Sequence, residues 1–177
     1  MAKIELHPDF KDFLRFLNSH NVRYLLVGGY AVGYHGYPRA TGDMDIWIEI
    51  SEVNSKKVVS AFRDFGMPDE TISEGLFLEK NKVIRMGVPP VRLEVITSAS
   101  GVSFNECYSN REVIEIDGIS INFISLQDLK KNKHAAGRYK DLEHLALKKT
   151  KWLSPENSPI GYVPVVFWPI GRFGIWA

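Results

Sequence analysis

The most constraining feature of this chain is an apolar run that ends in two glycines and is followed by a pair of aspartates. Residues 24–27 lead directly into Gly28 and Gly29, and thirteen residues separate these from Asp43 and Asp45 in the run DMDIWIEI. In a β-strand alternate side chains point to the same face, so the two aspartates project together while apolar residues fill the other face. Two carboxylates this close repel each other unless a positive charge lies between them. The pattern therefore predicts a divalent cation with oxygen ligands, and Mg²⁺ is the cation we expect.

A third acid, Glu94, follows in the later apolar run PVRLEVIT. Alternation places Arg92 and Glu94 on one face of that strand. An acid in an otherwise apolar strand costs stability unless it is paired or bound to a metal. Glu94 is thus the candidate for the third carboxylate that a site with two metal ions usually needs. The alternative is a structural ion pair of Glu94 with Arg92 or Arg39.

The glycine pair also predicts an anion site. Backbone N–H groups of a glycine-rich turn at a helix N-terminus bind anions, and a missing Cβ lets a phosphate approach the main chain of Gly28 and Gly29 closely. Together with the acids, this arrangement suits an in-line attack on a nucleotide phosphorus.

The rest of the pattern predicts an α/β fold with a mixed β-sheet and flanking helices. Ser51 and Ser125 are expected helix N-caps, and apolar alternation around Asp117-Gly118 is a strong hairpin signal. Gly137 is expected to end the helix that Ser125 begins. The expected helices span about 8–20, 30–35, 51–65, 126–136 and 138–149, and the expected strands span 24–27, 43–50, 76–78, 82–86, 91–97, 112–116 and 119–123.

The length of 177 residues fits one domain, which we place at residues 1–150. Residues 151–177 are rich in proline, glycine and aromatic side chains and show no period. This tail is interpreted either as an arm that packs on its own domain or on a partner chain, for example in a homodimer, or as sequence that plays no part in the fold.

The composition bears on disulfides, membrane contact and charge. Cys107 is the only cysteine, so an internal disulfide is impossible and a buried thiol is expected. The N-terminus lacks the apolar core of a signal peptide and no apolar run is long enough to cross a bilayer, so a cytoplasmic protein without membrane contact is expected. Basic residues gather late in the chain, where they form either a phosphate-attracting surface or a solvated helix face: Lys130, Lys131, Lys133, Arg138, Lys140, Lys148, Lys149 and Lys151.

Two further side chains lie near the motif. His35 is interpreted as a packing or hydrogen-bonding residue rather than a catalyst. Trp47 follows Asp45 on the same strand face, where it is either part of the core or a stacking partner for a base.

The combined sequence pattern resembles that of the nucleotidyltransferase superfamily of DNA polymerase β and the CCA-adding enzymes. It is most similar to the small bacterial and archaeal members of toxin–antitoxin and abortive-infection type. Their pattern G-G-x-A-[VL], H-G-x-x-R-x-T and D-x-D is carried here by Gly28, Gly29, Ala31, Val32, His35, Gly36, Arg39, Thr41, Asp43 and Asp45. The later segment NKHAAGRYKDLEHL resembles their K-x-A-x-x-R-x-K-D, so the resemblance covers about residues 20–148.

This resemblance implies a polymerase β palm-like fold and an enzyme that moves a nucleoside monophosphate from an NTP to a hydroxyl of RNA, such as tRNA, or of protein. Asp43, Asp45 and Glu94 would be the catalytic residues and would bind Mg²⁺, with two ions expected. The nucleotide-binding residues implied are Gly28, Gly29, Tyr30 through its amide, Arg39, Thr41, Lys133, Arg138 and Lys140.

The chain departs from the family pattern in two places. Its third acid is Glu rather than the commoner Asp, and Glu143-His144 stands where many relatives carry an Asp after K-D. The alternative function is a catalytically silent module of the same fold that acts as an antitoxin or as the partner of another protein.

Overall fold

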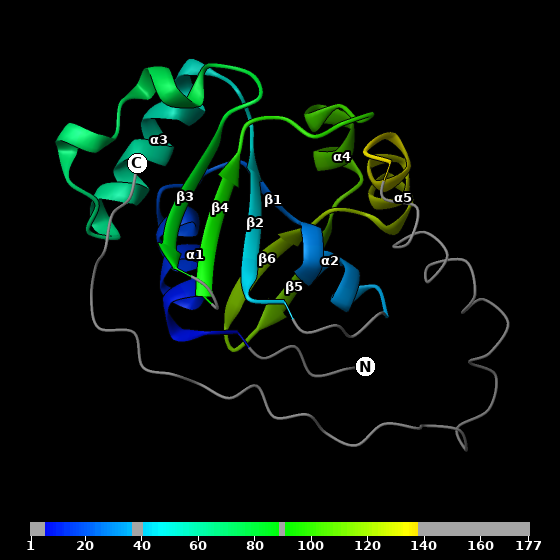
Figure 1. The fold of residues 1–177 in the computed structure, drawn as a ribbon. Helices are drawn as coiled ribbons and strands as arrows, with labels where there is room; N and C mark the ends of the chain where they lie inside the picture. The colour runs from blue at the N-terminus through cyan, green and yellow to red at the C-terminus, as the bar shows by residue number, and fades with distance from the viewer. Residues whose placement is uncertain (1–5, 37–40, 89–90, 138–177) are drawn as a thin grey trace, which may run out of the picture.

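Six strands form one mixed sheet in a computed structural model that describes residues 6–36, 41–88 and 91–137 (Figure 1). The predicted α/β class with a mixed sheet and flanking helices is confirmed. The strands are β1 (Tyr24–Val27), β2 (Asp43–Ile48), β3 (Val83–Val88), β4 (Val91–Ile96), β5 (Glu112–Ile116) and β6 (Ile119–Phe123). The helices are α1 (Pro8–Ser19), α2 (Gly28–Tyr34), α3 (Glu52–Asp64), α4 (Phe104–Ser109) and α5 (Leu126–Ala135), with 3₁₀ turns η1 (Asp69–Thr71) and η2 (Glu74–Phe77).

The strand order is β3-β4-β2-β1-β6-β5. β2 is antiparallel to β1 and parallel to β4, and the parallel pair places Asp45 opposite Glu94 and Asp43 opposite Arg92. Asp45 and its partner Glu94 are 49 positions apart in the sequence, yet they lie side by side in the sheet. The sheet, rather than local sequence, brings the acids together.

Helices α1 and α3 lie behind the sheet in Figure 1, whereas α2, α4 and α5 lie towards its right-hand side. α1 buries Phe10, Phe13, Leu14 and Leu17, which recur at helical spacing. Phe13 meets Phe62 of α3 edge to face with ring centroids 5.3 Å apart. These helices bury the apolar face of β2, which leaves the opposite face of that strand for the acids.

Local signals account for the ends of several elements. The Ser51 hydroxyl accepts a hydrogen bond from the Asn54 amide at 3.2 Å, and Ser125 caps α5 in the same way. Asp117 and Gly118 both adopt positive φ, 51° and 74°, as a two-residue hairpin of type I′ requires. The φ of Gly137 is 68°, and α5 ends just before it, as predicted.

The structure corrects the sequence prediction in the segment after α3. The strand predicted at 76–78 is wrong, because this segment lies in and just after η2, where Phe77 is fully buried and the Ser55 hydroxyl bonds the Glu74 carbonyl at 2.9 Å. η1 lies in the stretch between the predicted helix 51–65 and the predicted strand 76–78, and α4 was not predicted from the sequence. Cys107 is buried, as expected. The predicted helix 138–149 and the tail 151–177 lie outside the described residues.

No helix in the described ranges is long and apolar enough to cross a membrane.

Gly118 and Gly33 form a matched pair for testing the hairpin. A Cβ at either position meets no atom within 4 Å, but only Gly118 has positive φ. We expect Gly118→Ala to lower the free energy of unfolding by about 1–2 kcal/mol through backbone strain alone. Gly33→Ala, in helix α2, should raise it by about 0.5–1 kcal/mol. Urea unfolding followed by circular dichroism measures both, and equal effects of the two substitutions would contradict the hairpin geometry.

Candidate active site

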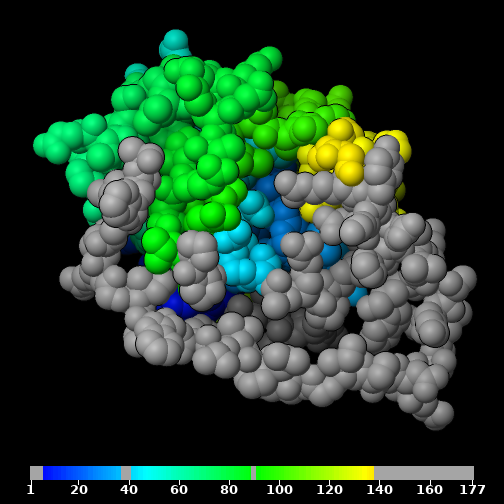
Figure 2. Space-filling model, in the orientation of Figure 1, coloured from blue at the N-terminus to red at the C-terminus, as the bar shows by residue number. Residues whose placement is uncertain are grey.

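The three predicted acids lie on neighbouring strands and on one face of the sheet. Asp43 and Asp45 alternate with the fully buried Met44 and Ile46 along β2. Glu94 lies on β4 directly opposite Asp45. Figure 2 shows the cyan atoms of the β2 region at the surface, between the green β3–β4 edge and the blue α2. The side chain of Asp43 is 38% exposed and that of Glu94 is 14% exposed.

The glycine elbow is built around the same side chains. Gly28 has φ +63°, and a Cβ placed on it would lie 1.8 Å from Asp45 Oδ2. A Cβ on Gly29 would lie 2.5 Å from Thr41 Oγ1. The Thr41 hydroxyl in turn donates to the Asp43 carbonyl oxygen at 3.1 Å. Both glycines are thus required sterically, because the acidic strand and the residue before it pack against the bare main chain.

Burial is the main reason that the pKa of the Asp45 carboxyl rises from 3.8 to about 6, and the charge of Glu94 adds to the rise. A hydrogen bond from the Gly29 amide and the charge of Lys133 act in the opposite direction. Lys133 comes from α5 and is itself buried. The structure therefore brings together Asp45, Glu94, the elbow and Lys133, all of which sequence reasoning had selected.

Two arginines offset this negative charge. Arg92 Nη2 lies 2.7 Å from Asp43 Oδ2 and 3.1 Å from Glu94 Oε1. Arg85 Nε lies 2.9 Å from the same Glu94 oxygen. Glu94 thus makes the ion pair with Arg92 that the alternative interpretation expected. Sequence reasoning missed the contact of Arg92 with Asp43, which the cross-strand register creates, and it missed Arg85, whose strand pairing with Glu94 depends on the same sheet.

The donor chemistry of the three acids suits a hard cation such as Mg²⁺, which prefers carboxylate oxygens. Across residues 6–36, 41–88 and 91–137, however, no three His, Cys, Asp or Glu side chains are arranged to hold a metal ion. The guanidinium of Arg92 touches Asp43 and Glu94 at once. The residues fit the ion in kind, and the arginine occupies the place between two of them.

Tyr30, His35 and Trp47 make structural contacts. The side chain of Tyr30 packs edge to face on Phe10, with the ring centroids 5.8 Å apart. The expected contact of Tyr30 with phosphate therefore falls to its backbone amide. His35 Nε2 lies 2.8 Å from the Ile124 carbonyl oxygen, a structural hydrogen bond. Trp47 is buried against Phe104 with ring centroids 5.2 Å apart, which favours the core interpretation. Arg39, Arg138 and Lys140 lie outside the described residues.

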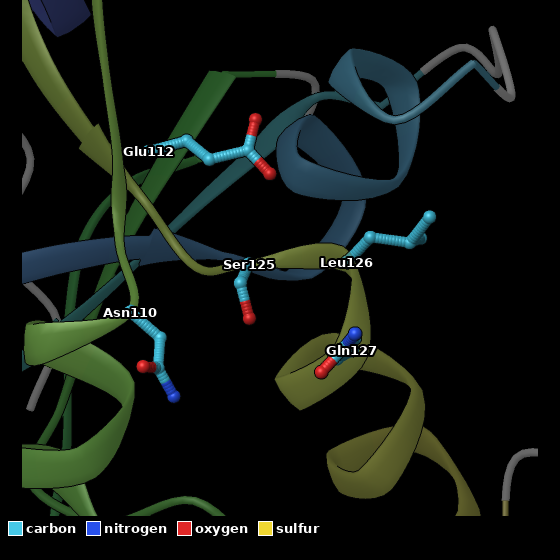
Figure 3. Close-up of a pocket in the computed structure, with 5 residues that line it drawn as sticks. All are labelled: Asn110, Glu112, Ser125, Leu126 and Gln127. Carbon is cyan, nitrogen blue, oxygen red and sulfur yellow. The ribbon is translucent and has the colours of Figure 1, made fainter.

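The hollows of the surface lie elsewhere. Figure 3 shows one of about 460 Å³, lined by Asn110, Glu112, Ser125, Leu126 and Gln127. Glu112 extends from it towards α2, where the Tyr34 hydroxyl donates to Glu112 at 2.8 Å. A second hollow, of about 390 Å³, lies beyond Trp47 beside α4. Neither of these two hollows is lined by the three acids.

Comparisons with known proteins agree with this fold. No protein-family model and no curated protein matches the chain by sequence. The chain is similar to the crystal structure of a candidate nucleotidyltransferase from Thermotoga maritima, with a TM-score of 0.53 and 14% identity. The match covers 80% of this chain and 92% of that protein. At this identity the similarity shows the fold, and the predicted nucleotidyltransferase-like α/β fold is confirmed.

The raised pKa of Asp45 makes stability depend on pH. Between 3.8 and about 6 the folded chain binds more protons at this carboxyl than the unfolded chain, so wild-type stability falls as pH rises through that window and stays lower above it. Asp45→Asn removes the charge that burial penalises. In buffer with EDTA we expect this variant to be more stable than wild type at pH 7.5, by up to about 3 kcal/mol.

Urea unfolding of both proteins at pH 4 and pH 7.5 measures the difference. The gap should close near pH 4, where the wild-type carboxyl is protonated in the folded state. A gap that is the same at both pH values would contradict the burial of an ionised Asp45.

Proposed function

We propose that this chain is a Mg²⁺-dependent nucleotidyltransferase that moves a nucleoside monophosphate from an NTP to a hydroxyl of RNA or protein and releases pyrophosphate. One observation supports it most: three carboxylates from two parallel strands lie on one face of the sheet, beside a glycine elbow at the start of a helix. The toxin–antitoxin or phage-defence setting that the sequence resemblance implies is part of this proposal.

In the proposed reaction the acceptor hydroxyl oxygen bonds to the α-phosphorus of the NTP, the bond to the bridging oxygen breaks, and pyrophosphate leaves. Asp43, Asp45 and Glu94 would hold Mg²⁺, which when bound supplies charge stabilisation for the entering and leaving oxygens. Glu94, which lies opposite Asp45 on β4, would also help to accept the proton of the hydroxyl.

The remaining residues would orient the triphosphate. The amides of Gly28, Gly29 and Tyr30 stand at the N-terminus of α2, where backbone N–H groups favour anions. The Gly29 amide bonds Asp45 in this structure, so a phosphate at that amide would compete with the carboxylate. Lys133 carries positive charge to the same place, and Thr41 fixes the elbow against β2. Arg39, Arg138 and Lys140 complete the proposed set.

A second candidate is a silent module of the same fold that binds a partner protein. The observation that favours it is the bridge from Arg92 to Asp43 and Glu94, which gives the acids a partner without any metal. Calorimetry with ATP, CTP, GTP and UTP, with and without Mg²⁺, separates the two. Metal-dependent nucleotide affinity supports the enzyme, and complete absence of nucleotide binding supports the module.

Asp43→Ala and Asp45→Ala should each lower Mg²⁺-dependent NTP turnover at least about a hundredfold, because each removes a carboxylate that would hold the ion at the reacting phosphate. Label transfer from each NTP to total cellular RNA and protein, with pyrophosphate release, measures this. Asp69→Asn is the matched control, because the side chain of Asp69 is 71% exposed and pairs with Arg63 of α3, which is not one of the proposed site residues. Unchanged turnover in both alanine variants would contradict the proposal.

A further inference from the structure

We propose that Arg92 is a built-in counter-ion of the acid cluster, which holds the carboxylates together without metal and must leave the space between Asp43 and Glu94 before Mg²⁺ binds there. This inference rests on the proposed function, because it assigns a role to the metal-free state of the same site. It makes Arg92 a positioning residue and not a catalytic one.

The first step of the argument is steric. One nitrogen, Arg92 Nη2, lies 2.7 Å from Asp43 Oδ2 and 3.1 Å from Glu94 Oε1. Mg²⁺ binds oxygen at about 2.0–2.1 Å, so an ion shared by these two oxygens would lie almost where this nitrogen lies. The guanidinium and the ion therefore exclude each other.

The second step concerns how the backbone fixes Arg92. Its Cα is the cross-strand partner of Asp43 in the parallel β2–β4 pair, and Glu94 follows two residues later on the same face. The side chain of Arg92 is 29% exposed, and those of Asp43 and Glu94 are 38% and 14% exposed. A guanidinium at this position can reach both acids at once, and the partial burial of Glu94 strengthens the attraction.

The third step concerns why this arrangement can open. In the described part of the chain Arg92 Nε is buried and has no hydrogen-bond partner. A buried donor without an acceptor carries a desolvation penalty. The bridging conformation thus makes two close ion pairs and leaves the Nε donor without an acceptor. Movement of the side chain into solvent would relieve the desolvation penalty of Nε.

Arg85 offers a contrast within the same site. Its Nε lies 2.9 Å from Glu94 Oε1, but its side chain is 59% exposed, and among the described residues its ion pair is with Glu94 and not with Asp43. It contributes positive charge without standing between two acids. Arg85→Gln is therefore the matched control for Arg92→Gln, since both remove one charge next to Glu94 and only the second clears the space.

The test is titration of the full chain with Mg²⁺ alone, by calorimetry, at fixed ionic strength and without nucleotide. We expect Arg92→Gln to bind Mg²⁺ about tenfold more tightly than wild type, because the ion no longer competes with a charge-assisted bridge. Arg85→Gln should change the affinity much less. The melting temperature of Arg92→Gln in EDTA should fall below that of wild type and should recover with Mg²⁺ more than wild type does, because the uncompensated acids repel one another.

Arg92→Lys keeps the charge and loses the planar guanidinium. We expect its Mg²⁺ affinity to lie between those of wild type and Arg92→Gln, and it replaces the glutamine variant if that one does not fold.

The outcomes separate the two proposals. Equal or weaker Mg²⁺ binding by Arg92→Gln, or equal tightening by Arg85→Gln, overturns the role of Arg92 and leaves the proposed function standing if Asp43→Asn abolishes binding in the wild-type background. Absence of Mg²⁺ binding in every variant overturns both. Tightening confined to the two Arg92 variants supports the counter-ion role.

Discussion

The parallel pairing of β2 with β4 is the constraint on which the candidate site depends. This register places Asp45 beside Glu94 and Asp43 beside Arg92. A slip of one residue would turn Glu94 to the opposite face of the sheet, where Met44 and Ile46 are buried. The core therefore fixes the face on which the acids lie, because Met44 and Ile46 belong to the same buried hydrophobic cluster as Phe13 and Phe62.

Electrostatics gives the site its second property. Burial and the neighbouring Glu94 raise the pKa of Asp45 to about 6, while the Gly29 amide and Lys133 favour the ionised form. Arg92 and Arg85 balance the remaining charge. The negative charge of the three acids is thus offset by positive groups from β3, β4 and α5. A cation that bound to the acids would displace some of these positive side chains, so metal binding would depend on where those side chains lie.

Much of the fold was predictable because its signals are local. The apolar spacing of α1, the Ser51 and Ser125 caps and the Asp117-Gly118 turn each encode one element within a few residues. The segment after α3 was predicted wrongly, since a single buried side chain, Phe77, gives the same apolar signal in a 3₁₀ turn as in a strand. α4 has no side-chain cap and is too short for a period to appear.

The candidate site, too, was predicted from the sequence only where its signals are local. Alternation along one strand placed Asp43 and Asp45 on one face, and the packing of Gly28 against Asp45 explains why the glycines precede them. The bridge from Arg92 to Asp43 joins residues that are 49 positions apart, so it follows from strand pairing and from no local pattern. Strand order is decided by the whole core, which is why the sequence indicated the acids and the pairing of Arg92 with Glu94 but missed the contact of Arg92 with Asp43.

The most direct test of the account is a crystal structure with Mn²⁺ and a non-hydrolysable NTP analogue, with anomalous scattering to locate the metal. The account predicts a metal peak in contact with the carboxylates of Asp43, Asp45 and Glu94, the triphosphate at the amides of Gly28 and Gly29, and Arg92 Nη2 displaced from its present position. A fully bound nucleotide whose metal lies away from these carboxylates, or Arg92 still bridging Asp43 and Glu94 with the metal bound by both, would contradict it.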